Sequence, residues 1–236
     1  LRFLKNYFQS ENIVLVKSGR QGLKLILENL NFGPEGEVIV PSFICQVVPE
    51  AVTRAGLAPV FCPMERGAFN MDIEVAKKLI NSQTKAIILT HFFGLPAKLE
   101  EFLELAQKNH LFLIEDCAHA FGSRRRGRLA GTFGNASIFS FGLSKNIGGL
   151  GGGFVLCRDA ELAQKITGQK QKKSHDFFRY FEFLFIALFF NKYFYFLFGG
   201  LIEAYGRLRS RKINDQEFLS CLSGLQAKVA WRKLNR

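Results

Sequence analysis

The chain has 236 residues, 48% of them hydrophobic, which is enough for one large domain with a core, or one domain plus an appendage. Its net charge of +12 suits nucleic acid, anionic lipid or phosphorylated small molecules, but no nucleic-acid-binding motif accompanies the basic clusters. Five cysteines without CxxC spacing favour buried thiols in a reducing compartment over a disulfide framework or a zinc site. We also expect no N-terminal signal peptide.

Residues 1–160 alternate segments with helical and strand-like patterns. Apolar residues at helical spacing follow Ser18, which predicts a helix from Ser18 to about Leu30. Further helices are predicted at 47–55, 75–80 and 99–108, and strands at 38–40, 59–62, 86–90, 111–114, 137–141 and 154–157. Continuous apolar strands separated by amphipathic helices are typical of a parallel sheet that is covered on both faces. The fold class is therefore α/β, with three layers.

Phenylalanine dominates residues 177–205, where the only formal charge between Phe183 and Ile202 is Lys192. Twenty such residues approach the length of a membrane span, but Asn191, Lys192 and a Gly-Gly pair argue against a simple span. A shallow hairpin or an interfacial helix pair fits better, and would give peripheral membrane contact. A buried helical arm or a subunit contact in a soluble protein remains the alternative.

Polar side chains follow three of the predicted strands, and ligands gather at the carboxyl ends of strands in α/β sheets. Asp116, His91 and the run from Ser140 to Lys145 could bring carboxylate, imidazole, hydroxyl and amine groups to one edge. Pyridoxal phosphate (PLP) needs such a set: a lysine amine for its aldehyde, an acid for its ring nitrogen, and amides at a helix N-terminus for its phosphate. The predicted helix at Ser18 offers that N-terminus. The alternative for Asp116 is that it simply caps a following helix.

Several segments make a resemblance specific. They read VIVPSFICQVVPEAVTRAGLAPVF, TKAIILTHFFG, LFLIEDCAHAFGS and GTFGNASIFSFGLSKNIGGLGGGFVL. Together they resemble the DegT/DnrJ/EryC1/StrS family of sugar aminotransferases, over roughly residues 10–160. The resemblance implies a three-layer α/β/α fold with a mostly parallel sheet of the PLP-transferase type. The Phe-rich block then becomes a helical insertion, and the C-terminal small domain of the family is missing.

The expected domains are a PLP-binding large domain (1–165), a basic and Phe-rich helical insertion (166–212), and the start of a connection to the missing small domain (213–236). LSGLQAKVAW near the end resembles the segment that follows the large domain in the family. We expect both ends of the chain to be truncated. Leu150 stands where the family often has a glutamate, and the family's Tyr-Asn-Tyr-Arg stretch is not visible.

The resemblance also implies site residues, position by position. Lys145 matches the lysine that bonds to the PLP aldehyde, Asp116 the acid under the pyridine nitrogen, and His119 the residue that reaches the phenolic oxygen. These three are the expected catalytic residues. Further cofactor contacts are expected from Gly19, Arg20, Gln21 and Ser140 at the phosphate, and from Cys45 against the ring face. Because Cys45 replaces an aromatic ring, stacking should be weaker here. No metal site is expected.

The implied activity is PLP-dependent transfer of an amino group from an amino acid such as glutamate to a keto-sugar, typically nucleotide-linked, in polysaccharide or aminosugar biosynthesis. We expect a cytoplasmic homodimer with small-molecule substrates and no nucleic acid. Residues 177–205 are expected either to contact the inner face of the membrane or to pack within the protein. Residues 124–128 could meet a nucleotide diphosphate or only solvent. The alternatives are a non-catalytic membrane-associated scaffold of the same fold, or a sugar dehydratase relative, in which the lysine is commonly replaced by histidine.

Overall fold

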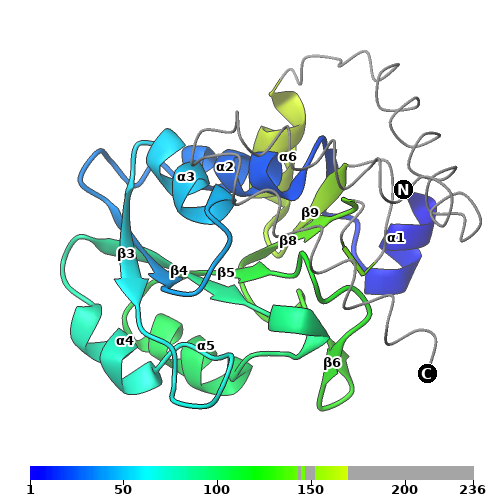
Figure 1. The fold of residues 1–236 in the computed structure, drawn as a ribbon. Helices are drawn as coiled ribbons and strands as arrows, with labels where there is room; N and C mark the ends of the chain where they lie inside the picture. The colour runs from blue at the N-terminus through cyan, green and yellow to red at the C-terminus, as the bar shows by residue number, and fades with distance from the viewer. Residues whose placement is uncertain (143–144, 147–151, 170–236) are drawn as a thin grey trace, which may run out of the picture. The chain divides into compact units, whose positions relative to one another are not determined.

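A computed structural model describes residues 1–142, 145–146 and 152–169 (Figure 1). The chain divides into two compact units, Leu1–Lys172 and Lys173–Arg236, and every described element belongs to the first. The helices are α1 Arg2–Phe8, α2 Gly19–Asn29, α3 Val47–Arg54, α4 Ile73–Leu79, η1 Phe92–Gly94 (a 3-10 turn), α5 Leu99–Lys108 and α6 Ala160–Gly168. The strands are β1 Ile13–Val16, β2 Glu37–Pro41, β3 Ala58–Cys62, β4 Thr84–Thr90, β5 Phe112–Asp116, β6 Arg124–Arg125, β7 Arg128–Leu129, β8 Ala136–Ser140 and β9 Gly153–Cys157.

Seven strands form one sheet in the order β1-β9-β8-β5-β4-β2-β3. The five strands from β8 to β3 are parallel, whereas β9 runs antiparallel to both of its neighbours, β8 and β1. Phe139 of β8 and Phe154 of β9 lie opposite each other, and their rings stack with centroids 4.3 Å apart. The mostly parallel sheet is confirmed, with β9 as the strand that departs from it.

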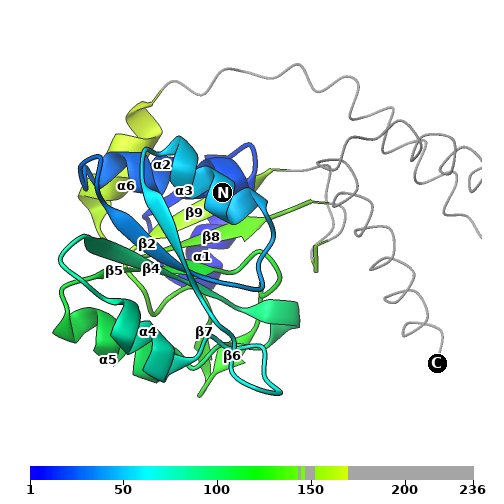
Figure 2. The same cartoon turned by 60° about the vertical axis from the view of Figure 1, so that its left-hand side comes forward.

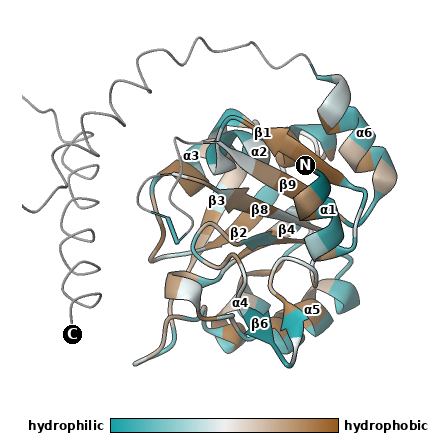
Figure 3. Cartoon of the chain, turned by 90° about the vertical axis from the view of Figure 1, so that its right-hand side faces the viewer, coloured by the Kyte–Doolittle hydropathy of each residue, from teal (hydrophilic) through white to brown (hydrophobic). Residues whose placement is uncertain are grey.

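Helices cover both faces of the sheet, as Figures 1 and 2 show, with α2, α3 and α6 on one side and α4 and α5 on the other. Alternate strand residues divide between the two layers: in β2, Val38 and Val40 pack beneath α2 and α3, while Ile39 packs toward α4 and α5. Figure 3 shows the central strands in the brown of hydrophobic residues, between helices with hydrophilic patches. The predicted three-layer α/β/α fold is confirmed.

The predicted helices and strands of residues 18–157 are all present, within a few residues of their predicted bounds. The sequence interpretation missed α1, β1, α6 and the β6–β7 hairpin. The four-residue strand β1 forms because Ile13 to Val16 pair with Leu156 to Gly153, far along the chain. Such a short apolar run gives no local signal of its own, and its strand conformation depends on that distant partner.

The Phe-rich segment at 177–205 lies outside the described residues, as does Leu150. Among the helices that are described, none is both long and apolar enough to cross a membrane. Membrane contact through residues 177–205 therefore stays a prediction, as do the domain boundaries at 165 and 212. Residue 165 itself lies within α6, which packs Leu162 and Ile166 into the core.

Candidate active site

The carboxyl edge of the sheet carries the predicted acid. Asp116 ends β5 and is 5% exposed, on the same face as Ile114, which packs in the core beneath α2 and α3. Its Oδ1 accepts a hydrogen bond from the N–H of Ala118 at 3.0 Å. This bond closes a local turn, and residues 117–123, which follow β5 directly, form no helix, so the alternative that Asp116 caps a following helix is wrong. Within the described residues, the second carboxylate oxygen has no hydrogen-bond partner.

The predicted lysine and histidine meet directly. Lys145 Nζ lies 2.9 Å from His119 Nε2. Burial lowers the pKa of His119, the positive charge of Lys145 lowers it further, and the negative charge of Asp116 opposes both. His119 therefore lies within electrostatic reach of both predicted catalytic partners. Being neutral at neutral pH, its ring accepts a hydrogen bond from the lysine through Nε2.

Two hydrogen bonds hold the segment that carries Lys145 in place. Its N–H donates to the carbonyl oxygen of Gly142 at 2.9 Å, and the neighbouring Asn146 donates from Nδ2 to the carbonyl oxygen of Phe121 at 2.9 Å. Because Phe121 is two residues after His119, this second bond ties the lysine segment to the loop that carries the imidazole. One main-chain bond and one bond from a side chain to the main chain thus support the contact between amine and imidazole.

The N-terminus of α2 lies against the end of β8. A Cβ atom on Gly19 would lie 3.3 Å from the Ser140 Cβ, which is tighter than most Cβ contacts, so glycine favours this close approach of the helix to β8. Ser18 caps the helix by accepting the N–H of Gln21 at 3.2 Å, and the Gln21 side chain accepts the N–H of Lys17 at 2.9 Å. The structure therefore joins Gly19 and Ser140, the predicted phosphate contacts, while the Gln21 side chain serves the cap.

Arg20 and Cys45 are the remaining predicted cofactor residues. The Arg20 side chain forms an ion pair with Glu50 of α3, with Nη1 and Oε2 3.7 Å apart. Cys45 is exposed in the segment before α3, and its carbonyl oxygen accepts the N–H of Val48. Among the described residues, neither side chain is hydrogen-bonded to the cluster around Lys145.

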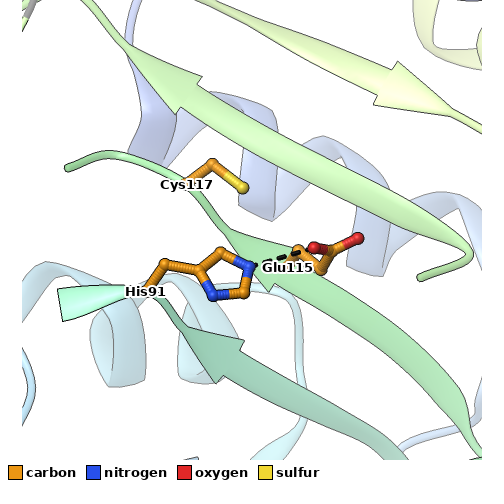
Figure 4. Close-up of side chains that lie close together, drawn as sticks. All are labelled: His91, Glu115 and Cys117. Carbon is orange, nitrogen blue, oxygen red and sulfur yellow. Dashed lines mark hydrogen bonds and ion pairs between the residues drawn. The ribbon is translucent and has the colours of Figure 1, made fainter. Parts of the chain in front are cut away.

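His91 does not join the site, which corrects the expectation from its position after β4. It is 0% exposed, its Nδ1 accepts the N–H of Ala97 at 3.0 Å, and its Nε2 lies 2.9 Å from Oε2 of Glu115 (Figure 4). Since Nδ1 accepts, Nε2 carries the proton and donates it to the carboxylate. His119, rather than His91, supplies the imidazole next to Lys145.

Glu115 is a fully buried carboxylate that the sequence interpretation missed. Its Oε1 accepts the N–H groups of Phe133 and Gly134, both at 2.7 Å, and its Oε2 accepts that of Gly131 at 2.8 Å as well as His91. Burial alone would raise the pKa of Glu115, but these hydrogen bonds and the nearby His91 outweigh it and lower the pKa. The signal was present in LFLIED, where an acid interrupts an apolar strand.

His91, Glu115 and Cys117 lie close enough together to suggest a metal site (Figure 4). Both nitrogens of His91 and both oxygens of Glu115 are already engaged in hydrogen bonds. Burial raises the pKa of Cys117 well above its ordinary value, which keeps the thiol protonated. His91 and Glu115 therefore form an internal hydrogen-bond network, in which Glu115 fixes the turn at residues 131–134 to β5.

The arginine cluster at 124–128 forms the β6–β7 hairpin, and its side chains bind groups of the protein itself. Arg125 and Arg126 form ion pairs with Glu100 of α5, at 3.0 and 3.3 Å. The guanidinium of Arg128 lies 4.3 Å from the centroid of the Phe133 ring. These contacts favour an ordinary charged surface hairpin over a diphosphate site.

Comparisons with known proteins agree with this geometry. A model of the DegT/DnrJ/EryC1/StrS aminotransferase family matches residues 2–181. The UDP-N-acetyl-3-dehydro-alpha-D-glucosamine 3-aminotransferase of Acidithiobacillus ferrooxidans is 43% identical over 158 residues, which cover 66% of this chain and 43% of that protein.

Two solved structures share the fold. DesV from S. venezuelae, in complex with a ketimine intermediate, has a TM-score of 0.67 and 36% identity, covering 74% of this chain and 49% of its own. The sugar aminotransferase Spr1654 of Streptococcus pneumoniae, in its PLP form, has a TM-score of 0.67 and 26% identity, covering 70% and 48%. The chain thus spans less than half the length of these relatives. Because the family model extends over most of the sequence, the chain belongs to the DegT/DnrJ/EryC1/StrS aminotransferase family.

Proposed function

We propose that this chain is the cofactor-binding part of a PLP-dependent aminotransferase that moves an amino group from an amino acid to a nucleotide-linked keto-sugar. The observation that carries the proposal is the 2.9 Å contact between Lys145 Nζ and His119 Nε2, within electrostatic reach of Asp116. The names of the relatives, among them an aminotransferase of a UDP-linked dehydro-sugar, support the substrate class.

The residues present fit PLP. The aldehyde and the phenolic hydroxyl of PLP are on neighbouring ring carbons, so the groups that engage them must lie side by side, as Lys145 and His119 do. The Asp116 oxygen that has no partner among the described residues is an acceptor for the protonated ring nitrogen. Ser140, next to Gly19 at the N-terminus of α2, fits the phosphate, because a helix N-terminus favours an anion.

When bound, PLP supplies an electron sink that stabilises negative charge at the α-carbon of the amino-acid substrate. Lys145 Nζ can take the proton from that carbon and return it, as a general base and acid. The buried carboxylate of Asp116 favours a positive charge on its partner nitrogen, which strengthens the sink. His119, neutral at neutral pH, orients the lysine amine through Nε2.

The test is covalent labelling of the full chain. Incubation with PLP, borohydride reduction and peptide mass spectrometry should place the cofactor on Lys145, and Lys145→Ala should abolish the label. Lys98→Ala is a matched control, because Lys98 is a surface lysine paired with Glu65 at 2.7 Å, and should leave the label unchanged. Equal labelling of the Lys145→Ala variant would overturn the assignment of Lys145. A wild-type chain that takes up no PLP would instead favour the non-catalytic scaffold.

The finer expectations follow from family membership. We propose that the whole protein acts as a homodimer on small-molecule substrates in the cytoplasm, with glutamate as a candidate amino donor. The dehydratase alternative is disfavoured, because position 145 carries lysine. Light scattering would report the oligomeric state, and amino transfer to a nucleotide-linked keto-sugar would test the activity.

A further inference from the structure

We propose that Thr90 is a positioning residue of the same site, and that its hydroxyl holds the free carboxylate oxygen of Asp116 at the ring-nitrogen end of the cofactor. This inference rests on the proposed function. Its starting point is that Thr90 Oγ1 is the only buried side-chain nitrogen or oxygen atom, among the described residues, without a hydrogen-bond partner. Buried polar groups are nearly always paired, so this exception requires an explanation.

The sheet places Thr90 beside Asp116. Thr90 ends β4, Asp116 ends β5, and the two are partners in the parallel register. Strand side chains alternate between faces, and Ile88 and Ile114, two residues earlier, both pack in the core beneath α2 and α3. Thr90 and Asp116 therefore extend from the same face of neighbouring strands. They are 6% and 5% exposed.

The two side chains have complementary chemistry. A carboxylate only accepts hydrogen bonds, whereas a threonine hydroxyl can donate one. Oδ1 of Asp116 already accepts from Ala118, and its other oxygen has no partner among the described residues. Without PLP the Thr90 hydroxyl is unpaired within the described part of the chain. Neighbouring strands are about 4.8 Å apart, so a change between staggered χ1 rotamers when PLP binds can bring the hydroxyl to that oxygen.

The consequence concerns the orientation of the carboxylate. With Ala118 N–H on one oxygen and the Thr90 hydroxyl on the other, the plane of the carboxylate is fixed, and lone pairs remain for a cationic ring nitrogen. Serine at position 90 would preserve this arrangement. Valine, which has the same shape without the hydroxyl, would leave the carboxylate free to rotate.

The experiment measures PLP affinity of the full chain by absorbance titration, beside thermal unfolding without PLP. We expect Thr90→Val to weaken PLP binding about ten-fold, as for one hydrogen bond to a charged group, and Thr90→Ser to stay within about two-fold of wild type. Without PLP, Thr90→Val should unfold at the wild-type temperature or above, because it removes an unpaired buried hydroxyl. Thr90→Ala carries the same affinity expectation should the valine variant not fold.

Thr84 provides the matched control at the other end of β4. It is also buried, but its Oγ1 accepts the N–H of Asn81 at 3.0 Å. Thr84→Val should therefore lower the unfolding temperature and leave PLP affinity unchanged. If Thr90→Val binds PLP as tightly as wild type, or if Thr90→Ser loses as much PLP affinity as Thr90→Val, the inference about Thr90 is overturned while the proposed function stands. A wild-type chain that forms no PLP adduct on Lys145 would overturn the proposed function together with it.

Discussion

Replacing Glu115 by glutamine tests the buried network that underlies the site. The carboxylate accepts four hydrogen bonds, two on each oxygen, from Gly131, Phe133, Gly134 and His91. A glutamine amide has the same shape but presents an NH₂ group in place of one oxygen. In either orientation of the amide, its NH₂ group faces two of the four hydrogen-bond donors. Those two donors then have no acceptor.

The His91 ring cannot relieve this conflict. To accept a hydrogen bond from the new amide, Nε2 would have to lose its proton, and Nδ1 would have to carry it instead. Nδ1–H would then point at the N–H of Ala97, so two donors would face each other. Each buried donor left without an acceptor costs about 1–3 kcal/mol, so we expect Glu115→Gln, which orphans two, to lower the free energy of unfolding by about 2–6 kcal/mol.

Urea unfolding followed by far-ultraviolet circular dichroism measures this change. Glu101→Gln is the control, because Glu101 is an exposed residue of α5, and should change the free energy of unfolding by less than about 0.5 kcal/mol. A loss below about 1 kcal/mol for Glu115→Gln would refute the reasoning, since two orphaned buried donors cannot cost so little.

Acid provides a second readout of the same network. The pKa of Glu115 is lowered in the folded chain, so its ionised form stabilises the fold above the ordinary glutamate pKa of about 4.3. That stabilisation is lost as the pH falls through the folded-state pKa. The stability difference between wild type and Glu115→Gln should therefore be full at pH 7 and shrink on acidification. A difference that grows below pH 4 would contradict the lowered pKa.

Two further substitutions test local features of the fold. Ser18→Ala removes the hydroxyl that caps α2 and should cost about 1 kcal/mol of unfolding free energy in urea, whereas an unchanged value would show that the cap contributes nothing. A Cβ atom on Gly153 would overlap the carbonyl oxygen of Phe139, so Gly153→Ala should separate β8 from β9 and reduce soluble, folded protein. Gly168→Ala, which meets no atom within 4 Å, should fold normally, and equal behaviour of the two variants would argue against the β8–β9 contact.

Local signals were sufficient for most elements of the fold. The apolar spacing after Ser18 predicted α2, and the predicted helix at 99–108 coincides with α5. Helical and strand periods are encoded within a few residues, so no knowledge of the tertiary structure is needed to detect them. Strand ends that carry polar residues likewise indicated where Asp116, Ser140 and Lys145 belong.

Properties that depend on distant pairing could not be obtained in this way. The direction of β9 and the existence of β1 follow from a pairing between residues 13–16 and 153–156. Arg20 matched a predicted phosphate contact by position, but the packing of α2 against α3 pairs its side chain with Glu50. Neither the pairing of β1 with β9 nor the ion pair of Arg20 can be deduced from the neighbouring residues in the sequence.

The two histidines show the division between sequence and structure most clearly. The sequence by itself determined the layers of the fold and the edge of the sheet at which the polar residues gather. Only the tertiary structure decided that His119 meets Lys145 while His91 is buried with Glu115. The physical reason is strand register. A shift of one residue moves a strand-end side chain such as that of His91 to the opposite face of the sheet, and the register is set by pairing between strands that are far apart in the chain.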